Sequence, residues 1–268
     1  METDEVGQLL EARLGRCTVG WVKLEQTKAS SLGSGTLIKY RSVLGVITCG
    51  HVVEVLKELD EFGLCFFPVR PSEYQRLKFK RNVVEFFQIG EDYKSHPYHG
   101  PDLGFVKIPL EYEEDIKLHS VVLNMDIQSD EYQRVGYQTP STSVLCGVVD
   151  ERTTPGPQKS NYGVTTFNGL INIGNITDRY SIYDYDYLKF QPLPGPDGKL
   201  PSSFAGTSGG GFWNICFTQA GDGIKFSKRL FSGVAFAEMK DSESVTILTH
   251  GPISIYEKLL PMIRERWL

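Results

Sequence analysis

Short runs of apolar or alternating residues fill most of the chain, and turn-forming residues separate them. Examples are "CTVGWVKLEQ", "GSGTLIKY", "NVVEFFQIG", "YQRVGYQT" (Tyr132–Thr139), "SVLCGVVD" and "LFSGVAFAE". Such runs are rich in β-branched and aromatic residues, which is typical of strands in a sandwich or barrel. About a dozen of them occur, and this number predicts an all-β fold rather than alternating strands and helices. One further run, Tyr183–Phe190, alternates acidic and aromatic residues and predicts a strand with one wet face.

Helical periodicity is confined to three segments. Two short helices are predicted at Asp4–Leu14 and His51–Glu61. The third covers residues 252–268, where apolar residues recur on one face, namely Ile255, Leu259, Met262, Ile263 and Trp267. Pro261 is expected to kink this helix or split it in two, because proline lacks the N–H that an inner turn requires.

About a dozen strands divide naturally into two six-stranded antiparallel barrels. The stretch Leu110–Ser120 is the least strand-like part near the middle, so we expect it to connect the two halves. We therefore expect one domain over residues 1–268, with an N-terminal barrel at 15–115, a C-terminal barrel at 121–250 and a C-terminal helix at 252–268.

Charge and hydropathy exclude several classes of function. The chain has 268 residues, of which 40% are hydrophobic and 23% are charged, and its formal net charge is −5. A mildly acidic chain whose longest basic block is "KFKR" is a poor candidate for binding nucleic acid. No apolar run is long enough to span a membrane, and the acidic start "METDE" does not resemble a secretory signal.

The cysteine and histidine positions argue against a metal centre. The cysteines do not cluster and read as reduced, mostly buried thiols of a cytoplasmic protein; they are Cys17, Cys49, Cys65, Cys146 and Cys216. No CxxC or HExxH pattern is present, so we expect no metal and no cofactor. His96 and His99 are expected in a loop that lines a cleft, and His119 and His250 are expected at the surface.

Four glycines surround one serine in "FAGTSGGGFWN", residues 204–214. A serine hydroxyl is a weak nucleophile until a base accepts its proton and hydrogen-bond donors await the oxyanion. Gly206 and Gly209 would let the backbone turn sharply around Ser208 and leave room for a substrate. Taken alone, the segment fits a loose turn between strands equally well.

Two upstream residues supply partners for this serine. His51 follows the apolar run "GVITCG", which places its imidazole at a strand end. Asp102 precedes the apolar run "LGFVKI", where a carboxylate can accept a histidine N–H. A histidine, an acid and a glycine-flanked serine together predict acyl transfer.

These three segments resemble the three motifs of the chymotrypsin-like (trypsin-fold) serine peptidases. "GSGTLI…GVITCGHV" resembles the strand pair leading to the family's histidine, "PDLGFVKI" its aspartate strand, and "GTSGGGFW" its serine loop. The chain order His, Asp, Ser also agrees. The resemblance implies two β-barrels, a catalytic triad of His51, Asp102 and Ser208, and an oxyanion hole formed by the N–H groups of Gly206 and Ser208.

The chain departs from the secreted members of that family. Thr207 stands where they keep the aspartate that pairs with a new N-terminus after cleavage, so activation by that ion pair is not expected. Val52 stands where they keep a cysteine after the histidine, which favours the intracellular, bacterial type.

The resemblance also implies where a substrate pocket would lie. Its floor would be Ser202, and its wall would lie near Phe236 and Ala237. A neutral floor favours an apolar P1 residue, whereas Glu238 leaves a basic P1 residue open.

The function expected from the resemblance is that of a cytoplasmic serine endopeptidase acting on a protein or peptide. Two alternatives stay open: a catalytically silent trypsin-fold binding module, and an effector peptidase held inactive until a sensor partner engages it. A regulatory protein partner fits the last of these, and no interaction with nucleic acid or membrane is expected.

Overall fold

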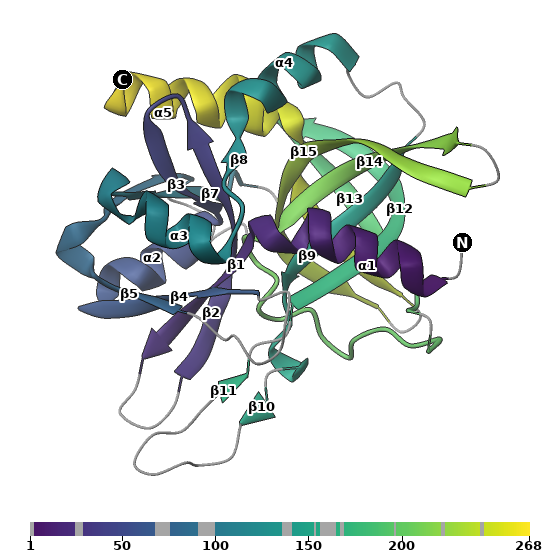
Figure 1. Ribbon diagram of the computed structural model, residues 1–268, viewed down its shortest axis with the longest axis horizontal. Helices are drawn as coiled ribbons and strands as arrows, with labels where there is room; N and C mark the ends of the chain where they lie inside the picture. Colours follow the sequence, from purple (N-terminus) through teal and green to yellow (C-terminus); the bar gives the residue numbers. More distant parts are fainter. Residues whose placement is uncertain are drawn as a thin grey trace.

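Strands make up most of the described chain in the computed structural model (Figure 1). The structure describes residues 3–24, 29–67, 76–90, 100–135, 141–152, 154–155, 165–166, 169–195, 197–220, 223–241 and 244–268. These residues hold sixteen strands, of which three are only two residues long. The prediction of a mainly β protein is confirmed.

The first sheet is a curled, open half-barrel in the strand order β5-β4-β1-β2-β3-β7-β6, with β8 beside β2. Its strands are β1 (Thr18–Leu24), β2 (Ala29–Tyr40), β3 (Val43–Thr48), β4 (Glu61–Phe66), β5 (Arg76–Lys80), β6 (Glu85–Ile89), β7 (Leu103–Ile108) and β8 (Leu123–Asn124). All pairs are antiparallel except β2–β8. The edge strands β5 and β6 follow each other along the chain, but the helical turn Arg81–Val83 redirects the backbone, and no ladder joins them within the described ranges. The predicted closure of this half into a barrel is therefore not seen.

The second sheet closes into the predicted six-stranded antiparallel barrel, in the order β12-β13-β16-β15-β14-β9. Its strands are β9 (Thr142–Val148), β12 (Gly169–Ile182), β13 (Tyr185–Pro192), β14 (Gly211–Ala220), β15 (Gly223–Lys240) and β16 (Val245–His250). Its large buried side chains fall into two clusters: Phe190 and Phe212 pack with other barrel residues, whereas Trp213 and Phe231 belong to the cluster that includes the core of the first sheet. Closure leaves the barrel without an unpaired edge, whereas the first sheet ends at β5 and β6 among the described residues.

The connection between the sheets is helical. The predicted linker Leu110–Ser120 forms a 3₁₀ turn and then α3 (Glu113–His119), which begins with three acidic residues and thus matches the helix dipole. After β8 comes α4 (Met125–Val135). The strand predicted at Tyr132–Thr139 is wrong in its first half, because Tyr132 to Val135 end this helix; its remainder lies outside the described residues.

The remaining elements are short. They are α1 (Thr3–Arg13), α2 (Gly50–Glu58), the 3₁₀ turns Gly15–Cys17 and Asp150–Arg152, and the paired strands β10 (Thr154–Pro155) and β11 (Thr165–Thr166). The predicted helices at Asp4–Leu14 and His51–Glu61 correspond to α1 and α2. In the parts of the chain that the structure describes, no helix is long and apolar enough to cross a membrane.

The C-terminal helix links the two halves (Figure 1). It leaves the barrel after β16 as a π-helical segment, Ile253–Leu259, and continues as α5 (Leu260–Trp267). The change from π to α geometry falls beside Pro261, whose missing N–H would break a regular ladder. At the far end, the Trp267 ring packs on Phe87 and Phe105 of the first sheet. The helix therefore packs against both sheets.

Candidate active site

His51 stands where the apolar strand β3 ends and α2 begins. All six residues of β3 are buried, and the helix begins at Gly50 with Cys49 in extended conformation before it. A Cβ at Gly50 would lie 2.9 Å from Asp102 Oδ1, so the glycine lets the two segments approach closely. The His51 side chain remains 28% exposed and can therefore be reached from solvent.

Asp102 lies just before β7 and holds the His51 imidazole. One carboxylate oxygen, Oδ1, accepts the His51 backbone N–H at 2.9 Å, and the other, Oδ2, lies 2.5 Å from His51 Nδ1. The Asp102 side chain is only 4% exposed, so this contact is shielded from water. The contact at Nδ1 fixes the proton there, which leaves Nε2 as the basic nitrogen.

The serine loop, residues 204–210, is a pair of successive tight turns that leads into β14. The Thr207 N–H donates to the Phe204 carbonyl at 3.0 Å, and the Gly210 N–H donates to the Thr207 carbonyl at 2.7 Å. Gly206 and Gly209 have φ values of +90° and +88°, in the left-handed region that favours glycine. A Cβ at Gly206 would also collide with the Asp150 carboxylate.

The backbone N–H groups of the serine loop differ in whether a described residue accepts a hydrogen bond from them. Those of Thr207, Gly209 and Gly210 donate to carbonyl oxygens. Those of Gly206 and Ser208 have no acceptor among the residues that the structure describes. Two unpaired donors that flank one residue make a binding place for an oxygen anion.

Ser34, a fully buried residue of β2, ties the serine loop to both sheets. Its N–H donates to the Ser208 carbonyl at 2.7 Å, and its hydroxyl donates to the Gly206 carbonyl at 2.7 Å. The same hydroxyl accepts the Val148 N–H of β9 at 2.7 Å, and the Ser34 carbonyl accepts the Thr48 hydroxyl at 2.6 Å. The loop is thus positioned against the strand that leads to His51.

The Ser208 side chain is partly exposed on this loop. The neighbouring Gly209 N–H and the Cys49 thiol both donate to the Ala235 carbonyl, at 2.7 and 3.0 Å, so the two chain segments meet on β15. No hydrogen bond joins the Ser208 hydroxyl to His51 within the described part of the chain. Serine–histidine bonds often tighten only when substrate binds. The structure therefore brings His51 and Asp102 into contact and places Ser208 on the facing segment.

Cys49, His51 and Asp102 offer three atoms of metal-ligand type within 4.8 Å of one another. A thiol must lose its proton to bind a metal. Burial raises the pKa of Cys49 well above its ordinary value, and the nearby Asp102 charge raises it further. His51 Nδ1 already contacts Asp102. The donor chemistry does not fit a metal site.

His250, at the end of β16, is a site residue that sequence reasoning missed. The prediction that it lies at the surface is wrong, because it has no solvent exposure. Its Nε2 accepts the Asp102 backbone N–H at 3.0 Å. Burial lowers its pKa to about 4, so the imidazole is neutral at pH 7. His119 is half-buried against the Phe66 ring, while His96 and His99 lie outside the described residues.

The residues predicted to form a substrate pocket lie on two adjacent segments. Ser202 is exposed, and its N–H and hydroxyl donate to the Glu151 carboxylate. The Phe236 side chain is buried, and Ala237 packs at the edge of the core. The Glu238 carboxylate crosses to the serine loop, where it accepts the Phe204 N–H at 3.0 Å and the Ser203 hydroxyl at 3.2 Å. Any substrate contact at Phe236 would be with its backbone.

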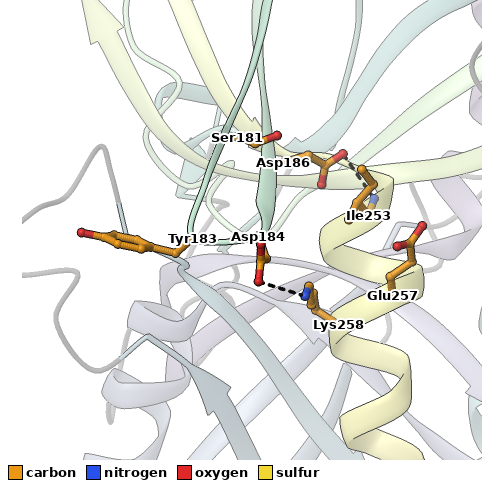
Figure 2. Close-up of a pocket in the computed structure, with 7 residues that line it drawn as sticks. All are labelled: Ser181, Tyr183, Asp184, Asp186, Ile253, Glu257 and Lys258. Atoms are coloured by element: carbon orange, nitrogen blue, oxygen red, sulfur yellow. Dashed lines mark hydrogen bonds and ion pairs between the residues drawn. The ribbon is translucent and has the colours of Figure 1, made fainter.

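A separate open cavity of about 630 Å³ lies where the β12–β13 turn meets the C-terminal helix (Figure 2). Its charged lining groups have partners: Asp184 lies 3.8 Å from Lys258, Asp186 accepts the Ser254 and Ile253 N–H groups at the helix start, and Glu257 accepts the Tyr132 hydroxyl. None of His51, Asp102 and Ser208 lines it. We interpret it as a structural junction.

No model of a known protein family matches the chain, and no curated protein matches it. The function proposed below therefore depends on the geometry of the site.

Proposed function

We propose that the chain is a serine endopeptidase of the chymotrypsin-like type, with His51, Asp102 and Ser208 as its triad. One observation carries the proposal: a shielded His51–Asp102 pair lies beside a serine loop on which the Gly206 and Ser208 N–H groups have no acceptor among the described residues. Donors in this position, next to an oriented imidazole, are suited to stabilise an oxyanion that forms on the residue attacked by Ser208.

The proposed reaction is acyl transfer in two steps. Ser208 Oγ bonds to the scissile carbonyl carbon while His51 Nε2 takes the hydroxyl proton. The carbonyl oxygen becomes an oxyanion and accepts from the Gly206 and Ser208 N–H groups. The intermediate then expels the amine, which leaves with the proton from His51. Water repeats the sequence on the acyl-enzyme and releases the acid.

Asp102 stabilises the imidazolium that forms in each step. It keeps the Nδ1 proton in place, and its burial strengthens the interaction with the positive ring. Neither step requires a cofactor.

The preferred P1 residue is proposed to be apolar. Ser202 is neutral, and the Glu238 carboxylate is already bonded to the Phe204 N–H and the Ser203 hydroxyl. A peptide-library cleavage profile tests this. Enrichment of Arg or Lys at P1, lost in Glu238→Gln, would contradict the apolar assignment and favour a basic one.

A cytoplasmic location is proposed with this function. All five cysteines are free, which is the state favoured by a reducing compartment. Fractionation of the native host cell checks this, and recovery of the chain with cysteines paired in an oxidising compartment would contradict it.

A fluorophosphonate probe tests the proposed nucleophile without knowledge of the substrate. We expect the wild-type chain to be labelled and Ser208→Ala to remain unlabelled. Labelling that appears only after a partner protein is added would favour the regulated effector peptidase. Failure to label under every condition, together with tight stoichiometric binding of one partner, would favour the silent binding module.

A further inference from the structure

A histidine from the barrel contacts the backbone of Asp102 beside the first sheet. His250 ends β16, and its Nε2 accepts the backbone N–H of Asp102 at 3.0 Å. Asp102 precedes β7, so its N–H is outside the ladder between β6 and β7, which starts at Leu103. The imidazole therefore supplies an acceptor that the sheet does not.

The His250 ring has little freedom to move. Its backbone is paired with Tyr187 on one side and with Val234 on the other. Its ring lies 4.9 Å from the Tyr187 ring and 4.8 Å from the Phe236 ring, measured between centroids. A side chain held in this way can fix the position of the group that it contacts.

The hydrogen bond determines the protonation state of His250. Because Nε2 accepts, it carries no proton, and the single proton of the neutral ring is on Nδ1. Nδ1 is buried and has no partner among the described residues. Burial, which lowers the pKa of His250, keeps the ring in this neutral form. An unpaired buried donor is tolerated here, which indicates that the acceptor at Nε2 matters.

We propose that His250 is a positioning residue for Asp102. Through Nε2 it holds the Asp102 backbone so that one carboxylate oxygen meets His51 N–H and the other meets His51 Nδ1. This inference rests on the proposed function only in assigning catalysis to the His51–Asp102 pair. Without the acceptor, a buried N–H directly beside that carboxylate would be unpaired, and the carboxylate would shift.

Three variants of His250 and one control variant test the role of the acceptor. Gln in H250Q carries an amide oxygen at about the reach of Nε2, whereas Met in H250M has similar length and no comparable acceptor. Asn in H250N is an amide that is one methylene shorter. Thr249→Val is the control, because the Thr249 hydroxyl is buried and has no partner in the described residues.

Two readouts are measured on the full chain. The first is the rate of fluorophosphonate labelling, which we expect to fall about 10- to 100-fold in H250M and H250N and to recover in H250Q. The second is the far-downfield proton resonance of the His51 Nδ1–H, which does not require a working nucleophile. It should shift or vanish in H250M and H250N and persist in H250Q and T249V.

The outcomes separate this inference from the proposed function. Equal labelling and equal resonances in H250Q, H250N and H250M would overturn the positioning role. Equal loss in H250Q and H250M would overturn it too, since the ring would then serve for packing alone. If H250M fails to fold, the comparison of H250Q with H250N decides. If the wild-type chain never labels but the resonance follows the expected pattern, only the peptidase proposal fails.

Discussion

The two halves of the candidate site differ in how completely their polar groups are paired. On the first sheet, both carboxylate oxygens of Asp102 and its N–H have partners, and the group is shielded from water. On the barrel, the Gly206 and Ser208 N–H groups have no acceptor within the described residues. Full pairing suits Asp102, which must keep one orientation. Free donors suit the N–H groups of Gly206 and Ser208, which would bind a negative charge that forms during the reaction.

The two sheets that carry the site residues also differ in closure. The acid and the histidine come from an open sheet, and the serine loop leads into a closed barrel. Contacts from the barrel and from the C-terminal helix hold the open sheet: His250 of the barrel bonds to Asp102, and Trp267 of the helix packs on Phe105. Substitutions in either half should therefore have different effects.

Asp102→Asn should disturb the orientation and tautomer of His51. An amide at this position favours the wrong imidazole tautomer, as in the chymotrypsin triad, where the same change costs about 10⁴ in kcat. We expect a loss of similar order in the rate of fluorophosphonate labelling. Thermal unfolding serves as the control for folding. Labelling of a folded D102N at the wild-type rate would show that Asp102 does not orient His51.

Gly206→Ala should displace the backbone N–H of residue 206, one of the two proposed oxyanion donors. The residue has φ +90°, and the new Cβ would collide with Asp150, so the backbone N–H must move. We expect labelling to slow by about 10²-fold. Gly198→Ala is the matched control, because Gly198 also has positive φ but has open space around it. A similar rate for both variants would contradict the account of the loop.

His250 should give the fold an acid-sensitive component. Its pKa is about 4 in the folded chain, against 6.5 for an ordinary histidine. Between these values the unfolded chain binds more protons, so the free energy of unfolding should fall as the pH falls, by up to about 3 kcal/mol. Urea unfolding across pH 4–7 of wild type and H250Q isolates this component, because Gln does not titrate. Parallel curves would contradict it.

Ser34→Ala should loosen the link between the halves. The change leaves the Val148 N–H and the Gly206 carbonyl unpaired in a buried place, and we expect a loss of about 1–3 kcal/mol in the free energy of unfolding. Ser30→Ala, at an exposed position of the same strand, is the control. Equal stability of the two variants would show that the hydroxyl does not hold the loop.

Asp184→Gly should have the smallest effect and lies away from both halves. Tyr183 and Asp184 have φ values of +50° and +66° in the β12–β13 turn, which suits glycine better. We expect stabilisation of up to about 1 kcal/mol and no change in labelling. Lys258→Met controls for the lost ion pair with Asp184. A decrease in stability beyond that of the control would contradict the claim of strain.

Sequence patterns predicted the parts of the fold that depend on local order. The apolar run before His51 became β3, the run after Asp102 became β7, and Gly206 and Gly209 lie in turns with positive φ. The open form of the first sheet could not be predicted. Closure depends on whether the edge strands β5 and β6 pair, and the helical turn Arg81–Val83 lies between them.

Residues that act across the two halves were the hardest to predict. His250 occupies a strand end with no alternation to mark it, and its ring is buried between the Tyr187 and Phe236 rings and the backbone of Asp102. Asp186 was expected on a wet strand face, yet it is buried because it caps the C-terminal helix. In both cases the deciding partner is more than 60 residues away along the chain.

The central claim is that Ser208 is a nucleophile activated by His51 and Asp102. Peptide mass mapping after fluorophosphonate treatment tests it most directly. We expect one phosphonylated residue, Ser208, in the wild-type chain, a rate about 10⁴-fold lower in D102N, and no adduct in Ser208→Ala. An adduct on another residue, or none under any condition tried, would contradict it.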